Sequence, residues 1–200
     1  MPGSTKIACI ILSAGMSKRF GGTKQLAKIK DGITLIQNAL NAANQSESDY
    51  VFLILGHFAS RILEDTSVGR AQVVLNKEFR KGLSSSLKSA ISNLPPDCSG
   101  ALFMVADQPF VNSRILNDMI DAFVAHPESR IVALAFNGSP RNPVLMSKEI
   151  FPELLSLEGD AGAREIVIRH SKETHLINIK ESRIFFDIDT RSDLEIGMSN

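Results

Sequence analysis

The chain has 200 residues, of which 44% are hydrophobic, and its 22 Lys and Arg balance 22 Asp and Glu. This length suits one domain with a sizeable core, so we expect a single domain over residues 1–200. A net charge of zero offers no general attraction for nucleic acid or a membrane surface, and neither is an expected partner. Two cysteines are too few for a disulfide framework. No apolar run reaches the ~20 residues of a membrane span, so we expect a soluble, cytoplasmic protein.

Apolar runs typical of buried strands alternate with segments of helical periodicity along most of the chain. The predicted strands cover residues 7–12, 50–56, 71–75, 101–105, 131–136, 142–146, 176–179 and 184–188. The predicted helices cover residues 34–45, 59–65, 84–94, 115–124 and 163–170, and a capping box at residues 190–193 opens a last one. This alternation predicts an α/β fold with a doubly wound, mostly parallel, Rossmann-like sheet.

The first predicted strand runs directly into a polar loop, in the stretch IACIILSAGMSKRFGGTKQL at residues 7–26. The loop carries three glycines and three cations: Gly15, Gly21, Gly22, Lys18, Arg19 and Lys24. Glycines let backbone N–H groups approach phosphate oxygens, and the cations neutralise phosphate charge. The spacing matches neither the P-loop nor the dinucleotide fingerprint. We interpret the stretch as a phosphate-binding turn, the alternative being a surface turn with solvated charges.

A second signal is the aspartate in MVADQP, where Asp107 directly follows a buried strand. A carboxylate in this position can hold a hard divalent cation such as Mg²⁺, or can cap the next turn. Further along, alternation places Asp187 and Asp189 on the same side of a predicted extended strand, where they could complete a metal site with Asp107. Asp189 could instead only mark a helix entrance.

Two further segments combine small and polar residues near predicted helix starts. In NKEFRKGLSSSL, donors that could contact a base or ribose are provided by Asn76, Gly82, Ser84, Ser85 and Ser86, although serines also cap helices. In RNPVLM and GDAGAR, the candidates for binding an anionic acceptor are Asn142, Asp160, Gly162 and Arg164, with helix capping as the alternative role of Asp160. Because ligands of open α/β sheets sit beyond the carboxyl ends of the strands, we expect these loops to converge on one crevice.

Together, LSAGMSKRFGGTKQL, NKEFRKGLSSSL, MVADQPFV, RNPVLM, GDAGAR and DIDTRSDL resemble the molybdenum-cofactor-type (MobA-like) NTP transferase family over nearly the whole chain. The pairing of G-L-S-S-S with G-D-x-G-A-R resembles the branch of this family that uses CTP and molybdopterin. The resemblance implies the nucleotide-diphospho-sugar transferase fold and a Mg²⁺ ion on Asp107. It implies a nucleotide site formed by Leu12, Ser13, Ala14, Gly15, Arg19, Lys24, Asn76 and the 82–86 segment. Two positions depart from frequent choices among relatives, namely Ser13 in place of Ala and Asn142 in place of His.

The implied reaction transfers CMP from CTP to a phosphorylated acceptor, molybdopterin, with release of pyrophosphate. A phosphate monoester is already ionised near neutral pH, so the expected catalytic groups are Arg19, Lys24 and the cation on Asp107 rather than a general base. Two alternatives remain open. The loop also suits transfer to a sugar or polyol phosphate, and the chain could be a non-catalytic NTP-binding accessory protein with a molybdoenzyme as partner.

Overall fold

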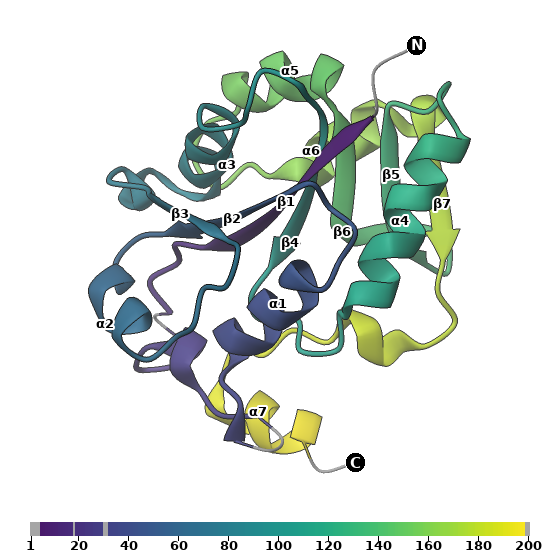
Figure 1. Ribbon diagram of the computed structural model, residues 1–200. Coiled ribbons are helices and arrows are strands. Elements are labelled where there is room, and N and C mark those ends of the chain that lie inside the picture. The colour runs from purple at the N-terminus through teal and green to yellow at the C-terminus, as the bar shows by residue number, and fades with distance from the viewer. Residues whose placement is uncertain (1–4, 18, 30–31, 199–200) are drawn as a thin grey trace.

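The computed structural model describes residues 5–17, 19–29 and 32–198, so the predicted loop cation Lys18 lies outside the described residues. These residues contain a seven-stranded sheet in the order β3-β2-β1-β4-β6-β5-β7 (Figure 1). The strands are β1 (Lys6–Ser13), β2 (Tyr50–Leu55), β3 (Gln72–Leu75), β4 (Cys98–Val105), β5 (Ile131–Phe136), β6 (Ser139–Ser147) and β7 (Thr174–Asn178). Only β6 runs antiparallel to its neighbours in this sheet. The predicted mostly parallel α/β architecture is confirmed.

Helices cover both faces of the sheet (Figure 1). The helices on the faces include α1 (Leu35–Asn44), α3 (Leu83–Ile91), α4 (Ser113–Ala125), α5 (Phe151–Ser156) and α6 (Ala163–Arg169). The chain also forms α2 (Ala59–Glu64) and, beyond one end of the sheet, α7 (Arg191–Met198). Side chains of a strand alternate between the two faces. In β1, Ile7 and Ile11 therefore pack with α1 and α4, whereas Ala8 and Ile10 pack with α3, α5 and α6. Filling two cores from one strand explains why β1 is a continuous apolar run.

Two of the predicted helix starts are confirmed by their capping hydrogen bonds. Thr34 Oγ1 accepts from the backbone N–H of Gln37 at 3.2 Å at the start of α1. At the start of α7, the Asp193 carboxylate accepts from the Thr190 backbone N–H at 2.7 Å, and Thr190 Oγ1 accepts from Asp193 N–H at 3.2 Å. The hydrogen bonds from Thr190 lower the pKa of the Asp193 carboxyl group. This reciprocal pair is the predicted capping box.

Helix α3 starts differently from the prediction. Its N-cap is Gly82, at φ +96°, and no side chain caps the helix. The three serines at 84–86 therefore lie inside the first turn, where they are buried. The prediction that serines occupy the N-cap is wrong, because the N-cap is Gly82, whose backbone tolerates a positive φ.

The predicted strand at residues 184–188 is also wrong. A 3₁₀ helix occupies Ser182–Phe185, and the residues that follow pair with no strand of the described sheet. The reason lies in the burial of its two isoleucines. Ile184 enters the large core under α1 and α4, whereas Ile188 enters a separate small cluster. One backbone bond, from Ile188 N–H to the Asp107 carbonyl at 3.0 Å, ties the segment to the end of β4.

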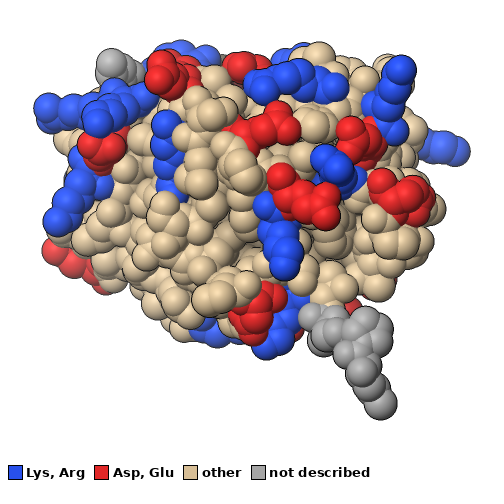
Figure 2. Space-filling view, turned by 90° about the horizontal axis from the view of Figure 1, so that it is seen from above, with Lys and Arg blue, Asp and Glu red and all other residues tan. Residues whose placement is uncertain are grey.

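Charged side chains are mixed over the surface seen from above (Figure 2). Lys and Arg alternate there with Asp and Glu, and neither sign forms a large patch on this face. In the part of the chain that the structure describes, no helix has the length and apolarity that crossing a membrane requires.

Candidate active site

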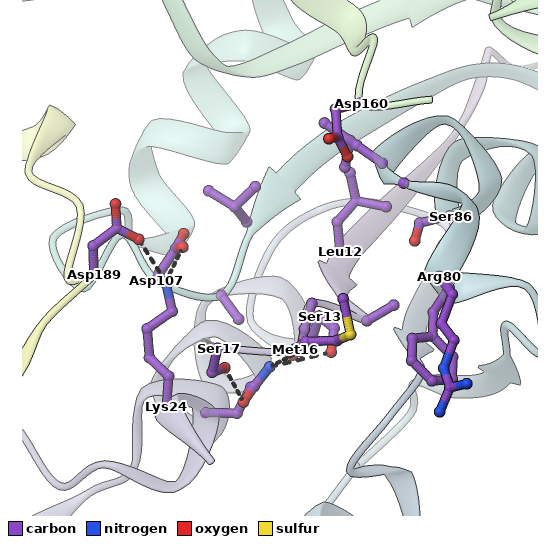
Figure 3. A pocket seen from close by; sticks show the side chains of 18 of the residues that line it. Leu12, Ser13, Met16, Ser17, Lys24, Arg80, Ser86, Asp107, Asp160 and Asp189 are labelled. Carbon is purple, nitrogen blue, oxygen red and sulfur yellow. Dashed lines mark hydrogen bonds and ion pairs between the residues drawn. The ribbon is translucent and has the colours of Figure 1, made fainter. Parts of the chain in front are cut away.

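A cavity of about 700 Å³ lies at the carboxyl ends of β1 and β4 (Figure 3). These two strands are neighbours where the sheet order changes direction, since β2 and β3 lie to one side of β1 and the later strands to the other. Such switch points are where open α/β sheets bind ligands, and the volume is in the range of small-molecule sites. The predicted site residues that line the first cavity are Leu12, Ser13, Ala14, Gly15, Arg19, Lys24, Gly82, Ser86, Asp107, Asp160 and Asp189.

The strongest electrostatic feature of the first cavity is a lysine between two carboxylates. Lys24 Nζ lies 2.7 Å from Asp107 Oδ2 and 3.0 Å from Asp189 Oδ1, and Arg19 lies 2.9 Å from the other oxygen of Asp189 (Figure 3). Burial alone would lower the pKa of Lys24, but the two carboxylates outweigh it and hold the pKa above its usual value. The ammonium group is therefore charged at neutral pH and shares its donors between two acids.

Asp189 reaches this cavity because of a small apolar cluster. Ile188 is fully buried and packs with Phe20 of the opening loop and Leu35 of α1. Together with the Ile188–Asp107 backbone bond, this packing holds residue 189 beside Lys24, which is 165 positions earlier in the chain. The same contacts order the loop that carries Arg19. A carboxylate near the C-terminus thereby becomes part of a site at the end of β1.

Gln25 braces the glycine-containing loop and was missed by the sequence analysis. Its Nε2 lies 3.5 Å from the Ser13 carbonyl and 3.3 Å from the Gly15 carbonyl, and its Oε1 accepts from Ser17 Oγ at 3.2 Å. The side chain is buried because a 3₁₀ helix at Lys24–Leu26 turns it inward. The sequence signal was a polar residue directly after the predicted site residue Lys24. Ser13 Oγ is buried at the cavity wall and has no hydrogen-bond partner among the described residues, so a ligand could supply one.

The opposite wall of the first cavity is formed by the end of the β3–α3 connection (Figure 3). Ser86 faces the cavity as predicted, and Arg80 lies near it with its guanidinium 5.7 Å from the Phe79 ring centroid. Arg80 and Lys81 were missed as site residues, although the basic pair before Gly82 in the sequence was a signal. Cations therefore flank the cavity on two sides, which suits a polyanionic ligand.

The other predicted nucleotide contacts lie behind this wall. Asn76 Nδ2 donates to Ser85 Oγ at 2.9 Å and to Ser86 Oγ at 3.1 Å. Ser85 Oγ donates to the Gly82 carbonyl at 2.7 Å. Ser84 is buried and does not line the cavity. Asn76 therefore holds Ser85 and Ser86 in position, and of these four residues only Ser86 lines the cavity.

A second cavity, of about 480 Å³, lies beside the first and contains two of the four predicted acceptor residues. Asn142 and Arg164 line it, whereas Asp160 lines the first cavity and Gly162 lines neither. A Cβ atom on Gly162 would come within 2.8 Å of Leu83 Cδ2, so Gly162 permits close packing against α3. The predicted single crevice is thus two adjacent cavities.

The two cavities are separated by the Asp107–Gln108 turn and the 187–189 segment. In the turn, Asp107 lines the first cavity and Gln108 the second, and in the 187–189 segment Asp189 lines the first and Asp187 the second. The prediction that Asp187 and Asp189 lie on the same side of a strand is therefore wrong, because this segment is not a strand of the described sheet and its two carboxylates line different cavities. Asp187 accepts from Gln108 Nε2 at 2.9 Å. Partial burial, followed by the negative charge of Asp107, raises the pKa of the Asp187 carboxyl group.

The oxygen ligands here fit a hard divalent cation. Asp107 and Asp189 present carboxylate oxygens to the first cavity, and Mg²⁺ is commonly held by one or two carboxylates together with substrate phosphates. In residues 5–17, 19–29 and 32–198, no three His, Cys, Asp or Glu side chains lie close enough together to hold an ion on their own. The arrangement therefore suits a cation that arrives with a phosphate ligand.

The tight contact between α3 and the 159–160 turn provides a stability prediction. Gly82 has φ +96°, and a Cβ atom there would lie 2.3 Å from the Gly159 carbonyl oxygen and 2.7 Å from Asp160 Oδ1. Gly82→Ala should therefore destabilise the fold by about 1–3 kcal/mol, which lowers Tm by roughly 2–4 °C per kcal/mol in calorimetry. Gly22→Ala is the control, because a Cβ atom at Gly22 has no neighbour within 4 Å. Equal Tm values for the two variants would contradict the prediction.

A basic, glycine-containing loop after the central strand, facing an aspartate after the neighbouring strand, defines a nucleotidyltransferase of the α/β class. Residues 9–174 match the MobA-like NTP transferase domain, and the chain belongs to this family.

The chain is similar to several known proteins over nearly its full length. The chain is 26% identical to nicotine blue oxidoreductase of Paenarthrobacter nicotinovorans, covering 94% of this chain and 96% of the relative. It is 24% identical to the molybdenum cofactor cytidylyltransferase of Escherichia coli K12, covering 94% of this chain and 93% of the relative. The structure of Rv0371c from Mycobacterium tuberculosis H37Rv matches with a TM-score of 0.86 and 28% identity, covering 99% and 100%. A manganese complex of Rv0371c matches with a TM-score of 0.80 and 26% identity, covering 98% and 100%.

Proposed function

We propose that this nucleotidyltransferase transfers CMP from CTP to molybdopterin, a phosphorylated acceptor, and releases pyrophosphate. The observation that carries the proposal is the placement of Lys24 between Asp107 and Asp189 at the ends of β1 and β4, opposite Arg80. The similarity to a molybdenum cofactor cytidylyltransferase supports the choice of CTP and molybdopterin. The adjacent second cavity provides room for an acceptor.

In this proposal the triphosphate occupies the first cavity. The Lys24 ammonium exchanges its carboxylate partners for phosphate oxygens, and the guanidinium group of Arg19 contributes a second charge-assisted contact. Asp107, together with Asp189, would hold Mg²⁺, which supplies charge neutralisation for the phosphates when bound. The manganese complex of Rv0371c supports a divalent metal in this fold. Ser13 Oγ, which is buried and unpartnered, would gain a hydrogen bond from the nucleotide.

The chemical step is an in-line substitution at phosphorus. An ionised oxygen of the acceptor phosphate forms a bond to the α-phosphorus of CTP, and the bond to the bridging oxygen breaks as pyrophosphate leaves. No proton has to be removed from the nucleophile, so the protein contributes position and positive charge rather than a base. Arg19, Lys24 and Asp107 are the proposed catalytic residues.

The first experiment compares thermal unfolding with CTP, GTP, ATP and UTP, each with Mg²⁺ or with EDTA. A ligand present at ~100 times its Kd stabilises by ~2.7 kcal/mol, which corresponds to a rise of roughly 5–10 °C for a domain of this size. We expect a Mg²⁺-dependent rise that is largest for CTP. A larger rise with another nucleotide would mean that this nucleotide, and not CTP, is the substrate.

The second experiment identifies the acceptor. Pyrophosphate release is measured with CTP, Mg²⁺ and either molybdopterin or a panel of sugar and polyol phosphates. Release with molybdopterin alone is the expected result. Pyrophosphate release with a sugar or polyol phosphate would mean that this compound, and not molybdopterin, is the acceptor. Binding of CTP without pyrophosphate release for any acceptor would favour a non-catalytic accessory role.

A further inference from the structure

The second cavity contains a buried oxygen atom without a hydrogen-bond partner. Gln108 is 6% exposed, and its Nε2 donates to Asp187 Oδ1 at 2.9 Å. A carboxylate can only accept hydrogen bonds, so the amide nitrogen must face Asp187 and the amide oxygen must face away from it. That oxygen, Oε1, has no partner among the described residues, although Gln108 lines the cavity. A buried acceptor of this kind is costly to leave unsatisfied, and a ligand that brings a donor would satisfy it.

The same cavity has two arginines without acidic partners. Arg141 comes from β6 and Arg164 from α6, and both are exposed. Neither forms an ion pair within the described part of the chain, whereas Arg130 and Arg169 nearby in the sequence each pair with glutamates. Two unpaired guanidinium groups on different elements of one cavity suit an anionic group of a ligand.

A third side of the cavity is apolar. The rings of Phe136 and Phe185 lie with their centroids 6.0 Å apart, and both residues line the cavity. The cavity thus combines an aromatic surface, two arginines and the Gln108 amide oxygen within about 480 Å³, and Asn142, Ser182 and Asp187 also line it. Polar groups on several sides of a cavity that also has an apolar wall are typical of sites that select one ligand orientation.

We propose that the second cavity selects its ligand by a donor and an acid together: an N–H or O–H group that donates to Gln108 Oε1, and a carboxylate or phosphate that contacts Arg141 and Arg164. The inference rests on the proposed function in one respect, namely that this ligand is the nucleotidyl acceptor. Gln108 follows Asp107 in the chain, so a ligand held by Gln108 is held at a fixed distance from the proposed reaction centre. Gln108 is then a specificity residue for the acceptor.

The test measures binding to the wild-type protein by calorimetry at pH 8 with matched probes. Glycerol 3-phosphate has O–H donors and a phosphate, methyl phosphate lacks the donor, and glycerol lacks the anion. In a second set, 6-carboxypterin has N–H donors and a carboxylate, and pterin lacks the acid. We expect each complete probe to bind at least about 5–10-fold more tightly than its incomplete partners, as one hydrogen bond or charge-assisted contact predicts. The set that binds more tightly shows whether the cavity prefers a ligand with a phosphate or one with a carboxylate.

Variants then assign the effect to residues. Gln108→Leu should weaken binding of the complete probes by about 5–10-fold and leave methyl phosphate unchanged. Arg141→Met and Arg164→Met should each weaken all anionic probes by about 10-fold. Gln72→Leu on the exposed edge of β3 and Arg114→Met on α4 are the matched controls. The Kd for CTP should remain unchanged in Gln108→Leu, which separates the second cavity from the first.

Two results would overturn the inference. One is equal affinity of the wild-type protein for complete and incomplete probes, or no binding of any probe, and this comparison does not depend on whether a variant folds. The other is an unchanged affinity in folded Gln108→Leu for every probe with a donor. Failure of the proposed function looks different, because pyrophosphate release would then be absent with CTP and molybdopterin while the dependence on Gln108 and the arginines remained.

Discussion

Asp107→Asn is expected to lower kcat for nucleotidyl transfer by about 10²–10³-fold, while the protein remains folded. The substitution keeps the shape of the side chain but removes its charge. A neutral amide holds a divalent cation weakly, and the Lys24 ammonium, which lies 2.7 Å from Asp107, loses one of its two carboxylate partners. The measurement is pyrophosphate release at saturating CTP, Mg²⁺ and acceptor, with Tm as the test of folding.

The matched control for this variant is Asp118→Asn. Asp118 is an exposed residue of α4, outside both cavities, so the same chemical change there should leave kcat within about twofold of wild type. A folded Asp107→Asn protein with a near-normal rate would contradict the proposed role of Asp107 in metal binding. A raised CTP Kd with unchanged kcat would instead limit Asp107 to ground-state binding.

Lys24→Met should reduce kcat/KM for CTP by about 10–100-fold, because one or two hydrogen bonds to ionised phosphate oxygens are lost. Methionine has a similar length, so the apolar part of the side chain is retained. The variant also has a second expected effect. Asp107 and Asp189 lose the cation between them, and Mg²⁺ or Mn²⁺ should then bind the nucleotide-free protein more tightly than it binds wild type.

Lys28→Met is the control, since Lys28 is an exposed residue just beyond the same loop and lines neither cavity. Steady-state kinetics and a Mn²⁺ titration are measured on both variants. Unchanged kcat/KM in Lys24→Met would remove Lys24 from the proposed catalytic residues. Weaker metal binding in Lys24→Met than in wild type would contradict competition between the ammonium and the ion.

The sequence by itself determined the features that depend on local pattern. The apolar run of β1 predicted a buried parallel strand because both faces of that strand are covered, and the glycines and cations after it marked the loop. Asp107 was recognisable because it directly follows a buried strand. The start of α1 was predictable from the spacing of its apolar residues, and the start of α7 from a capping box whose two residues lie three positions apart.

Only the tertiary structure decided how distant segments meet. Ile188 packs with Phe20 and Leu35, and this contact places Asp189 beside Lys24. Gly82 packs against the 159–160 turn and takes the N-cap that the serines were predicted to occupy. The crossing of the 187–189 segment over the Asp107–Gln108 turn divides the predicted crevice in two. A sequence pattern records which residues are apolar or charged, but the partner of each is chosen by packing between segments far apart in the chain, which local periodicity does not contain.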